Sequence, residues 1–264
     1  MSFRIWPNAT IHPTAEIDVR EGFIGDGAVI REHVKIEGQR VEIGRECFVD
    51  RGATIGGGSC FDPGAFLKAG DWLHVGRDSH LNTARGLTIG HECALRAQVF
   101  THGAYSDPIR FGVMPVWAPT VIGNHCWLPE ATVLAGVTIG EGTVVSAKSL
   151  VNRDLPPGVL AGGIPAKVLR PLQPLASETS IFALLEGVLA QTRRRDPSIP
   201  LLREGWRLWV STETVFDIRE RSITGTASAW STLLKDQLRR NGIRFRYVAD
   251  HFVWRPWKES PVER

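Results

Sequence analysis

The stretch Val121–Pro171, VIGNHCWLPEATVLAGVTIGEGTVVSAKSLVNRDLPPGVLAGGIPAKVLRP, decides the fold. Short apolar steps recur every five to seven residues and close on a small residue, as in VIG at 121–123, LAG at 134–136 and TIG at 138–140. Neither the helical period of 3.6 residues nor the strand period of two gives this spacing. It is typical of a coil of short strands joined by tight turns, in which each step points one branched aliphatic side chain into a narrow core.

The same rhythm extends upstream of this stretch. Further steps of an aliphatic residue followed by glycine stand at Ile24-Gly25, Ile43-Gly44, Ile55-Gly56, Val75-Gly76 and Ile89-Gly90. A three-sided coil needs about 18 residues per turn, and the steps at 122 and 139 fit that length, whereas those between 43 and 89 are irregular. We therefore predict an all-β left-handed parallel β-helix over residues 1–174, with bulged or shifted coils near residues 61–72.

One long segment interrupts the rhythm. Residues 101–119, THGAYSDPIRFGVMPVWAP, are rich in glycine, proline and aromatic residues and leave the coil between Phe100 and Thr120. Loops of this length in compact domains are usually functional. We predict that this segment is an active-site loop.

After Pro171 the character of the chain changes. Residues 175–264 predict a small α/β appendage, with helices over 177–194 and 228–240 and strands over 205–210, 214–225 and 243–254. This segment holds five of the nine tryptophans and an excess of arginine. A glycan-binding or oligomer-bracing role and a purely stabilising one are both open.

Composition limits the classes of function. The chain has 264 residues, of which 43% are hydrophobic and 22% charged, and a net charge of +3 is too small to indicate a nucleic acid or a membrane surface as partner. The cysteines at 47, 60, 93 and 126 have no zinc-site spacing, so we expect reduced thiols. The first residues, MSFRIWPNAT, are not typical of a signal peptide, and no apolar run has the length of a membrane span. We expect a cytoplasmic location.

Residues 87–171 resemble the hexapeptide-repeat acyltransferases, most closely the branch of maltose, galactoside and polysaccharide O-acetyltransferases. Three motifs carry the resemblance: Thr101-His102 at the mouth of the loop, IGNHCW at 122–127, and AKSLVNRDLPPGVLAGGIPAKVLR at 147–170. The last motif contains the family patterns D-x-P-P and G-x-P-A-[KR]-x-[IL]-[KR]. The resemblance implies acetyl-CoA as co-substrate and a homotrimer whose three sites are shared between subunits.

His102 is the predicted catalytic residue. Acyl transfer from a thioester requires the attacking hydroxyl or amine to lose a proton, and a neutral imidazole suits that task. The family places its catalytic histidine at the base of this loop, which is the position of His102. On the local sequence alone, an exposed loop histidine is the alternative.

The resemblance also implies a cofactor groove. The matching positions are Trp127 beside the pantetheine arm, Ala147, Asn152 and Arg153 along the groove, and Lys167 and Arg170 at the phosphates. Ionised donors to phosphate are favourable even when they are partly solvated. Trp127 could equally be a core or subunit-interface residue.

The acceptor site is less clearly marked. Candidate residues are Asn82, Tyr105, Asp107 and Glu130. At Glu130 the chain departs from the family, because WLPEA is one residue shorter than the usual W-I-G-x-x-A turn. In relatives this turn touches the thioester end of the cofactor, so Glu130 could orient His102 or meet an acceptor amine. We favour a solvated side chain.

Together these features predict an acetyl-CoA-dependent O-acetyltransferase of polysaccharide biosynthesis. It would act on a hydroxyl of a sugar or glycan precursor by direct transfer in a ternary complex. An N-acetyltransferase acting on an amino-sugar nucleotide or another amine is the main alternative. A metal enzyme like the γ-class carbonic anhydrases and a non-catalytic scaffold are more remote, and no metal is expected.

Overall fold

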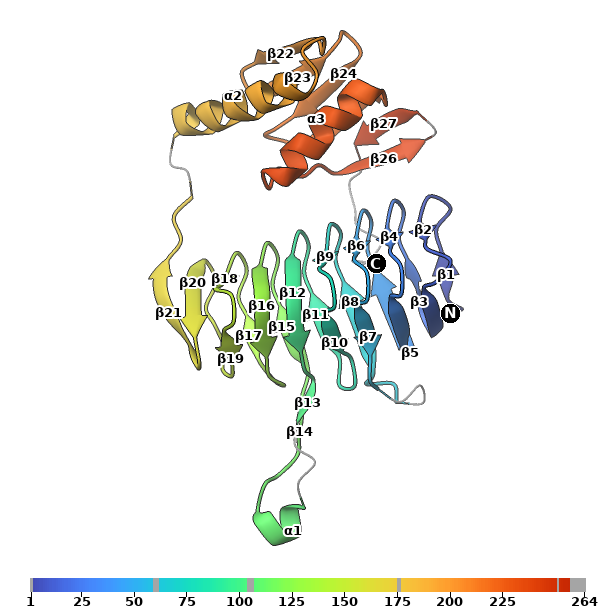
Figure 1. The fold of residues 1–264 in the computed structure, drawn as a ribbon, viewed down its shortest axis with the longest axis vertical. Helices are drawn as coiled ribbons and strands as arrows, with labels where there is room; N and C mark the ends of the chain where they lie inside the picture. Colours follow the sequence, from blue (N-terminus) through green and yellow to red (C-terminus); the bar gives the residue numbers. More distant parts are fainter. Residues whose placement is uncertain (1, 59–61, 104–106, 175–176, 251, 257–264) are drawn as a thin grey trace. The chain divides into compact units, whose positions relative to one another are not determined.

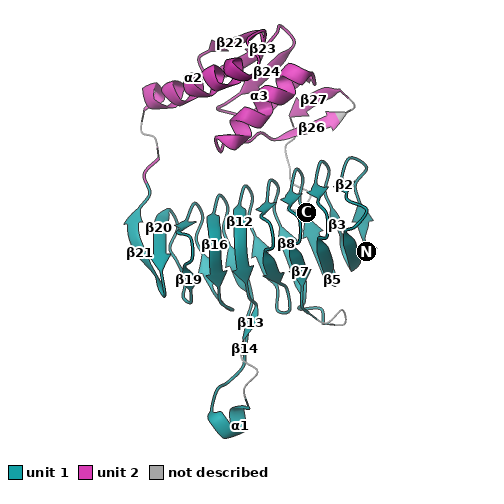
Figure 2. Ribbon diagram, in the orientation of Figure 1, with its two compact units in different colours: residues 1–172, 260–264 teal, residues 173–259 magenta. Residues whose placement is uncertain are grey.

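The computed structural model describes residues 2–58, 62–103, 107–174, 177–250 and 252–256. The chain divides into two compact units, residues 1–172 and residues 173–259 (Figure 2). The predicted domain boundary, after residue 174, lies two residues beyond this division. Each unit is described by itself below.

The first unit is a parallel coil of short strands (Figure 1). Nineteen of its strands in the described residues join in one sheet that winds round three faces, and within this sheet all pairings except that between β20 and β21 are parallel. The predicted left-handed parallel β-helix is confirmed.

Successive strands occupy the three faces in turn. Face one carries the first halves of β3 (Glu16–Ile24) and β5 (Lys35–Ile43), then β7 (Thr54–Gly56), β10 (His80–Asn82), the second halves of β12 (Ala94–Val99) and β16 (Trp127–Val133), and β19 (Leu150–Val151). Face two carries β1 (Arg4–Ile5), the second halves of β3 and β5, β8 (Phe66–Ala69), β11 (Leu87–Ile89), β15 (Thr120–Ile122) and β17 (Thr138–Ile139). Face three carries β2 (Thr10–Ile11), β4 (Val29–Ile30), β6 (Phe48–Val49), β9 (His74–Val75), the first halves of β12 and β16, β18 (Val144–Val145) and β20 (Val159–Gly163), with β21 (Ala166–Pro171) folded back on β20.

Two edges of this prism carry predicted site residues. Corner A, where faces three and one meet, includes residues 77–78, 129–130 and 146–148. Corner B, where faces one and two meet, includes residues 82–83, 100–102 and 152–153. Residues at one corner in neighbouring coils are separated by one strand spacing, about 4.8 Å.

The strand register explains the irregular spacing of the sequence steps. Ile43 pairs with Ala69, and Ala69 pairs with Ile89, so these three residues stand on face two in successive coils. Ile55 and Val75 belong to faces one and three. The steps at 55 and 75 therefore mark other edges of the coil and not successive turns of the same edge.

Glycine closes these steps because the next coil approaches closely. A Cβ added at Gly123 would lie 2.6 Å from the backbone nitrogen of Glu141 in the following coil. The inward aliphatic side chains, such as Ile36, Leu81 and Val133, are fully buried and form one continuous core. Each such side chain contributes about 1.5–3 kcal/mol by leaving water.

The predicted loop over 101–119 forms a hairpin that projects from the coil (Figure 1). Strand β13 (His102–Gly103) pairs antiparallel with β14 (Val116–Trp117), and the short helix α1 (Pro108–Phe111) lies between them. Asp107 caps α1 by accepting hydrogen bonds from the backbone N–H groups of Ile109 and Arg110.

The second unit packs two helices with an antiparallel sheet. The helices are α2 (Glu178–Arg195) and α3 (Ala229–Arg240), and the sheet order is β22 (Leu201–Glu204), β23 (Arg207–Val210), β24 (Thr214–Asp217), β25 (Ser222–Thr226), β27 (Val253–Pro256) and β26 (Tyr247–Asp250). Ser177 and Ser228 cap the two helices. The single strands predicted over 214–225 and 243–254 are wrong, because each segment contains two strands, β24–β25 and β26–β27, that pair antiparallel.

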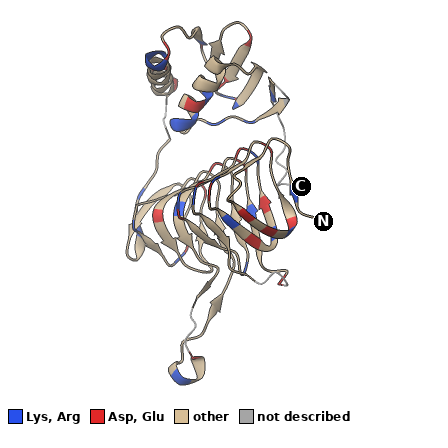
Figure 3. Cartoon of the chain, turned by 45° about the vertical axis from the view of Figure 1, so that its right-hand side comes forward, with Lys and Arg blue, Asp and Glu red and all other residues tan. Residues whose placement is uncertain are grey.

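Charged residues of both signs occur along the coils (Figure 3). Cys47, Cys93 and Cys126 are buried cysteines outside any disulfide among the described residues, and Cys60 lies outside those residues. No helix in the described part of the chain is both long and apolar enough to cross a membrane.

Candidate functional site

His102 is the first residue beyond the coil at corner B. The coil holds the base of its hairpin through two hydrogen bonds: Thr120 Oγ1 donates to the Phe100 carbonyl at 2.8 Å, and the Ala118 N–H donates to the Thr101 carbonyl at 3.1 Å. The histidine therefore sits at the fixed end of the hairpin, while α1 lies at the far end (Figure 1).

The imidazole of His102 lies between two side chains. Its Nδ1 is 3.0 Å from Oδ1 of Asn82, which belongs to the preceding coil. On the other side the ring stacks on Trp117, its cross-strand partner, with centroids 4.9 Å apart and planes inclined by 18°. These contacts leave His102 half-buried.

Asn82 is a buried hydrogen-bonding centre. The residue is 2% exposed, and its Oδ1 also accepts hydrogen bonds from Thr101 Oγ1 at 2.6 Å and from the Ala84 N–H at 3.2 Å. The Thr101 hydroxyl in turn accepts from the Arg85 N–H at 3.1 Å. The role in acceptor binding that we predict for Asn82 stays a prediction.

His80 is a second histidine near this network. It precedes Asn82 on β10, and its ring lies 6.1 Å from that of Phe100. Burial lowers the pKa of His80, and the neighbouring charge of His102 lowers it further. His80 is therefore neutral at neutral pH.

The predicted cofactor residues fall at three places. Trp127 stands on face three, 55% exposed, and Ala147 is exposed at corner A. Asn152 and Arg153 are exposed at corner B, directly after β19, two coils beyond the base of the hairpin. Lys167 and Arg170 are exposed on β21 at the end of the coil.

Glu130 is held by two cations at corner A. It is the extra residue of a bulge between Pro129 and Ala131, and its φ of 50° places it in the left-handed region. Its carboxylate pairs with Lys148 at 2.8 Å and with Arg96 at 2.6 Å. The hydrogen bond from Lys148, with the charges of Lys148 and Arg96, lowers the pKa of Glu130. The carboxylate keeps 31% of its side-chain surface exposed, so these ion pairs do not contradict the solvated side chain that we favour from the sequence, and the other roles considered for Glu130 stay predictions.

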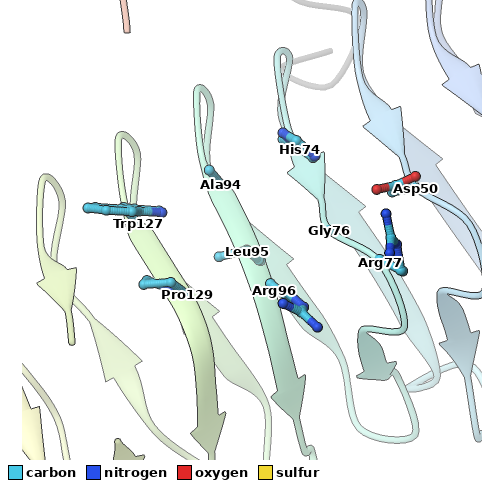
Figure 4. A pocket seen from close by; sticks show the side chains of 9 residues that line it. All are labelled: Asp50, His74, Gly76, Arg77, Ala94, Leu95, Arg96, Trp127 and Pro129. Carbon is cyan, nitrogen blue, oxygen red and sulfur yellow. The ribbon is translucent and has the colours of Figure 1, made fainter. Parts of the chain in front are cut away.

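A hollow of about 390 Å³ lies against corner A (Figure 4). Its walls include Trp127 and Pro129 on one side and Asp50 and Arg77 on the other, and Arg96 stands between them. Arg77 and Arg96 also line a second hollow of about 530 Å³, which continues round the corner to Lys148 and Ile164. Each hollow is large enough for part of a small-molecule ligand.

The remaining acceptor candidates lie on the hairpin. Asp107 is engaged as the cap of α1 and pairs with Arg110 at 3.5 Å, and Tyr105 lies outside the described residues. Among the residues that the structure describes, no group of three or more His, Cys, Asp or Glu side chains could hold a metal ion. The metal-enzyme alternative would need three convergent imidazoles, so nothing in the described part favours it.

Within one chain, corner A and corner B are separated by the width of face one. From Ala147 to Asn152 the chain runs along that face through β19. Residues 147–148 form a turn and β19 has two residues, so five residues span at most about 17 Å.

A parallel β-helix with a histidine at the base of a hairpin, and with the exit motif of residues 147–170, defines the class of hexapeptide-repeat acyltransferases. The galactoside O-acetyltransferase of Escherichia coli K12 is 31% identical over 129 residues, which cover 45% of this chain and 63% of that protein. WbbJ of the same organism, provisionally named a lipopolysaccharide biosynthesis O-acetyl transferase, is 30% identical over 147 residues, which cover 47% of this chain and 75% of WbbJ. The chain belongs to the hexapeptide-repeat acetyltransferases.

Other comparisons add little to this assignment. A solved hexapeptide-repeat acetyltransferase from Vibrio cholerae O1 biovar eltor, complexed with acetyl coenzyme A, is 29% identical, covers 47% of this chain and 72% of its own, and superposes with a TM-score of 0.37. No family model matches the chain. The chain spans 63% of the length of the galactoside O-acetyltransferase and 58% of that of a colanic acid biosynthesis acetyltransferase relative, also from Escherichia coli K12.

Proposed function

We propose that the protein is an acetyl-CoA-dependent O-acetyltransferase that acts on a hydroxyl of a sugar or glycan precursor. The observation that carries the proposal is the half-buried imidazole of His102, held at the base of the hairpin by Asn82 and Trp117. A general base must be fixed within hydrogen-bond reach of the proton that it removes. The imidazole is fixed in this way by Asn82, which is anchored in the coil, and by Trp117 at the base of the hairpin.

The proposed reaction is a direct transfer. The acceptor hydroxyl donates its proton to His102 as its oxygen attacks the thioester carbonyl, and the C–S bond then breaks. The proton passes from the imidazolium to the departing thiolate, which leaves as coenzyme A. The acceptor keeps the acetyl group as an ester. Backbone N–H groups beside the cofactor would stabilise the oxyanion.

The geometry of the coil supports a site shared between two copies. Glu130 and Ala147 lie at corner A, whereas His102, Asn152 and Arg153 lie at corner B. Reacting atoms must approach to about 3–3.5 Å, and the two corners lie at opposite ends of face one within a chain. Corner B of one copy would therefore meet corner A of the next, which a homotrimer with three equivalent sites allows.

The nature of the acceptor is the finer part of the proposal. The names of the two relatives above refer to O-acetylation of a galactoside and to lipopolysaccharide biosynthesis. A hydroxyl acceptor on a sugar is therefore our first choice, and an amino sugar is the alternative. A place in polysaccharide biosynthesis and a cytoplasmic location stay predictions.

Thiol release from acetyl-CoA tests the proposal. The purified protein is assayed against neutral sugars, sugar nucleotides and amino sugars, and the acetylated product is identified by mass spectrometry. We expect turnover with hydroxyl acceptors, a loss of at least about 100-fold in His102→Ala, and little change in His125→Asn at a distant corner. A protein that binds acetyl-CoA but acetylates nothing in the panel would refute the enzymatic assignment, and transfer to amines alone would favour the alternative.

A further inference from the structure

We infer that Asn82 is a positioning residue that fixes the tautomer and the orientation of His102. The inference rests on the proposed function for the role of His102 as a base, but its geometric part stands on the hydrogen bonds alone. Asn82 lies twenty residues upstream of His102 and touches it because the two are neighbours at corner B in successive coils.

The direction of the hydrogen bond follows from the neighbours of Asn82. A backbone N–H can only donate, so the atom of the Asn82 side chain that faces the Ala84 N–H at 3.2 Å must be the carbonyl oxygen. The Thr101 hydroxyl already accepts from the Arg85 N–H, and it donates its own proton to the same oxygen at 2.6 Å. The amide of Asn82 therefore cannot be turned round without placing two donors against its NH₂ group.

The same oxygen can only accept a hydrogen bond from His102. Nδ1 of the imidazole, 3.0 Å away, must carry the proton of the neutral ring. The lone pair then stands on Nε2, which becomes the nitrogen that can take a proton from the acceptor. The stack on Trp117 fixes the plane of the ring, and the bond to Asn82 fixes its rotation within that plane.

Burial makes this anchor rigid. Asn82 is 2% exposed and Thr101 is 0% exposed, so water cannot replace either partner. An amide oxygen also differs from a carboxylate, because it orients the imidazole without a negative charge that would hold the imidazolium. The arrangement suits a base that must release its proton to the departing thiolate in every cycle.

The test compares Asn82→Ala and Asn82→Asp with Asn124→Ala. Asn124 is a matched control: its Oδ1 accepts the His91 N–H at 2.8 Å, so it also bonds the preceding coil, but at a corner remote from His102. The readouts are kcat, the KM values for acetyl-CoA and for an acceptor from the panel above, the pH dependence of kcat/KM, and the denaturant midpoint. Two-dimensional ¹H–¹⁵N spectra of the imidazoles report the tautomer of His102 without any substrate.

We expect Asn82→Ala to lower kcat by about tenfold to 100-fold, a part of what a general base contributes, with each KM within about threefold. In the spectra, wild-type His102 should be protonated at Nδ1, and Asn82→Ala should show a mixture of tautomers. Asn82→Asp keeps the oxygen acceptor and should recover most of kcat. In this variant the fall of kcat/KM at low pH should begin at a higher pH, because a carboxylate stabilises the imidazolium.

Three results would overturn the inference. They are a wild-type ring protonated at Nε2, an Asn82→Ala variant whose kcat falls no more than that of Asn124→Ala, and a rise in acceptor KM with kcat unchanged, which would instead make Asn82 a binding residue. If Asn82→Ala does not fold, the Asn82→Asp variant and the wild-type spectra still test whether Asn82 fixes the tautomer of His102. Because the spectra need no turnover, a correct tautomer with no transfer activity would refute the proposed function and leave the geometric inference intact.

Discussion

Replacing Gly123 by alanine tests the packing of the coil on which the site is built. A Cβ at this position would lie 2.6 Å from the backbone nitrogen and 2.9 Å from the Cα of Glu141. Ordinary van der Waals contact for such an atom begins at 3.4 Å. The following coil must therefore move away by about 0.8 Å, and backbone cannot yield as the end of a flexible side chain does.

The cost follows from what that movement breaks. The Gly123 N–H donates to the Ile139 carbonyl, and the Gly142 N–H donates to the Asn124 carbonyl, each at 2.8 Å. A shift of about 0.8 Å lengthens both bonds beyond a useful distance. Two lost bonds at about 1 kcal/mol each, and overpacking of about 1–3 kcal/mol, give a loss of about 3–5 kcal/mol in the free energy of unfolding.

Urea denaturation followed by far-ultraviolet circular dichroism measures this loss. Gly103→Ala is the control in the same unit, because a Cβ there meets nothing within 4 Å and the backbone is not in the left-handed region. Its free energy of unfolding should stay within about 0.5 kcal/mol of the wild-type value. A Gly123→Ala protein less than about 1 kcal/mol below wild type would show that the coils can separate freely and would refute the reasoning.

Three further outcomes are expected. Replacing Lys167 and Arg170 together by glutamine should raise the KM for acetyl-CoA about tenfold or more but leave acetyl-pantetheine, which lacks the nucleotide phosphates, unaffected in steady-state assays. The pKa of His80 in the folded protein is lowered by burial and by the charge of His102. As the pH falls, the imidazole of residue 80 is therefore protonated in the unfolded chain at a higher pH than in the folded chain. Stability should therefore fall as the pH drops below about 6.5, and His80→Gln should reduce that slope in denaturation measured between pH 7 and 5. Finally, co-expressing His102→Ala with Ala147→Trp, each inactive alone, should restore activity if a site combines corners of two copies, and no restoration would place the site within one chain.

The coil is predictable from the sequence because each step repeats the same physical requirement. A narrow prism needs one aliphatic side chain inward per step and a small residue where the next coil approaches, and both requirements are local. The order of the faces is not local. Ile55 and Val75 fit the step pattern as well as Ile43 does, and only the pairing of Ile43 with Ala69 shows that they belong to other faces.

Likewise, only part of the candidate site can be predicted from the local sequence. The position of His102 at the mouth of an interruption can be found along the chain, but its contacts come from Asn82 and Trp117, which are distant in sequence. A usable signal for Asn82 exists: it stands about one coil before the hairpin base, so an 18-residue period brings it close to residue 100. No such rule predicts Trp117, whose pairing with His102 depends on the register of β13 and β14.

The hydrogen bond that orients the imidazole of His102 comes from the coil and not from the far end of the hairpin. One polar contact of the imidazole is to Asn82, and Asn82 is held by Thr101 and Ala84; all three of these residues are buried in or against the coil. The far end of the hairpin contributes exposed apolar side chains instead, including Phe111 at 69%. Residues at that end can change in size or move against a bound acceptor without altering the direction of Nε2. Under the proposed function, the coil would supply the fixed base that proton transfer needs, and the hairpin end would be the part of the chain in which acceptor preference can vary at little cost to the reaction.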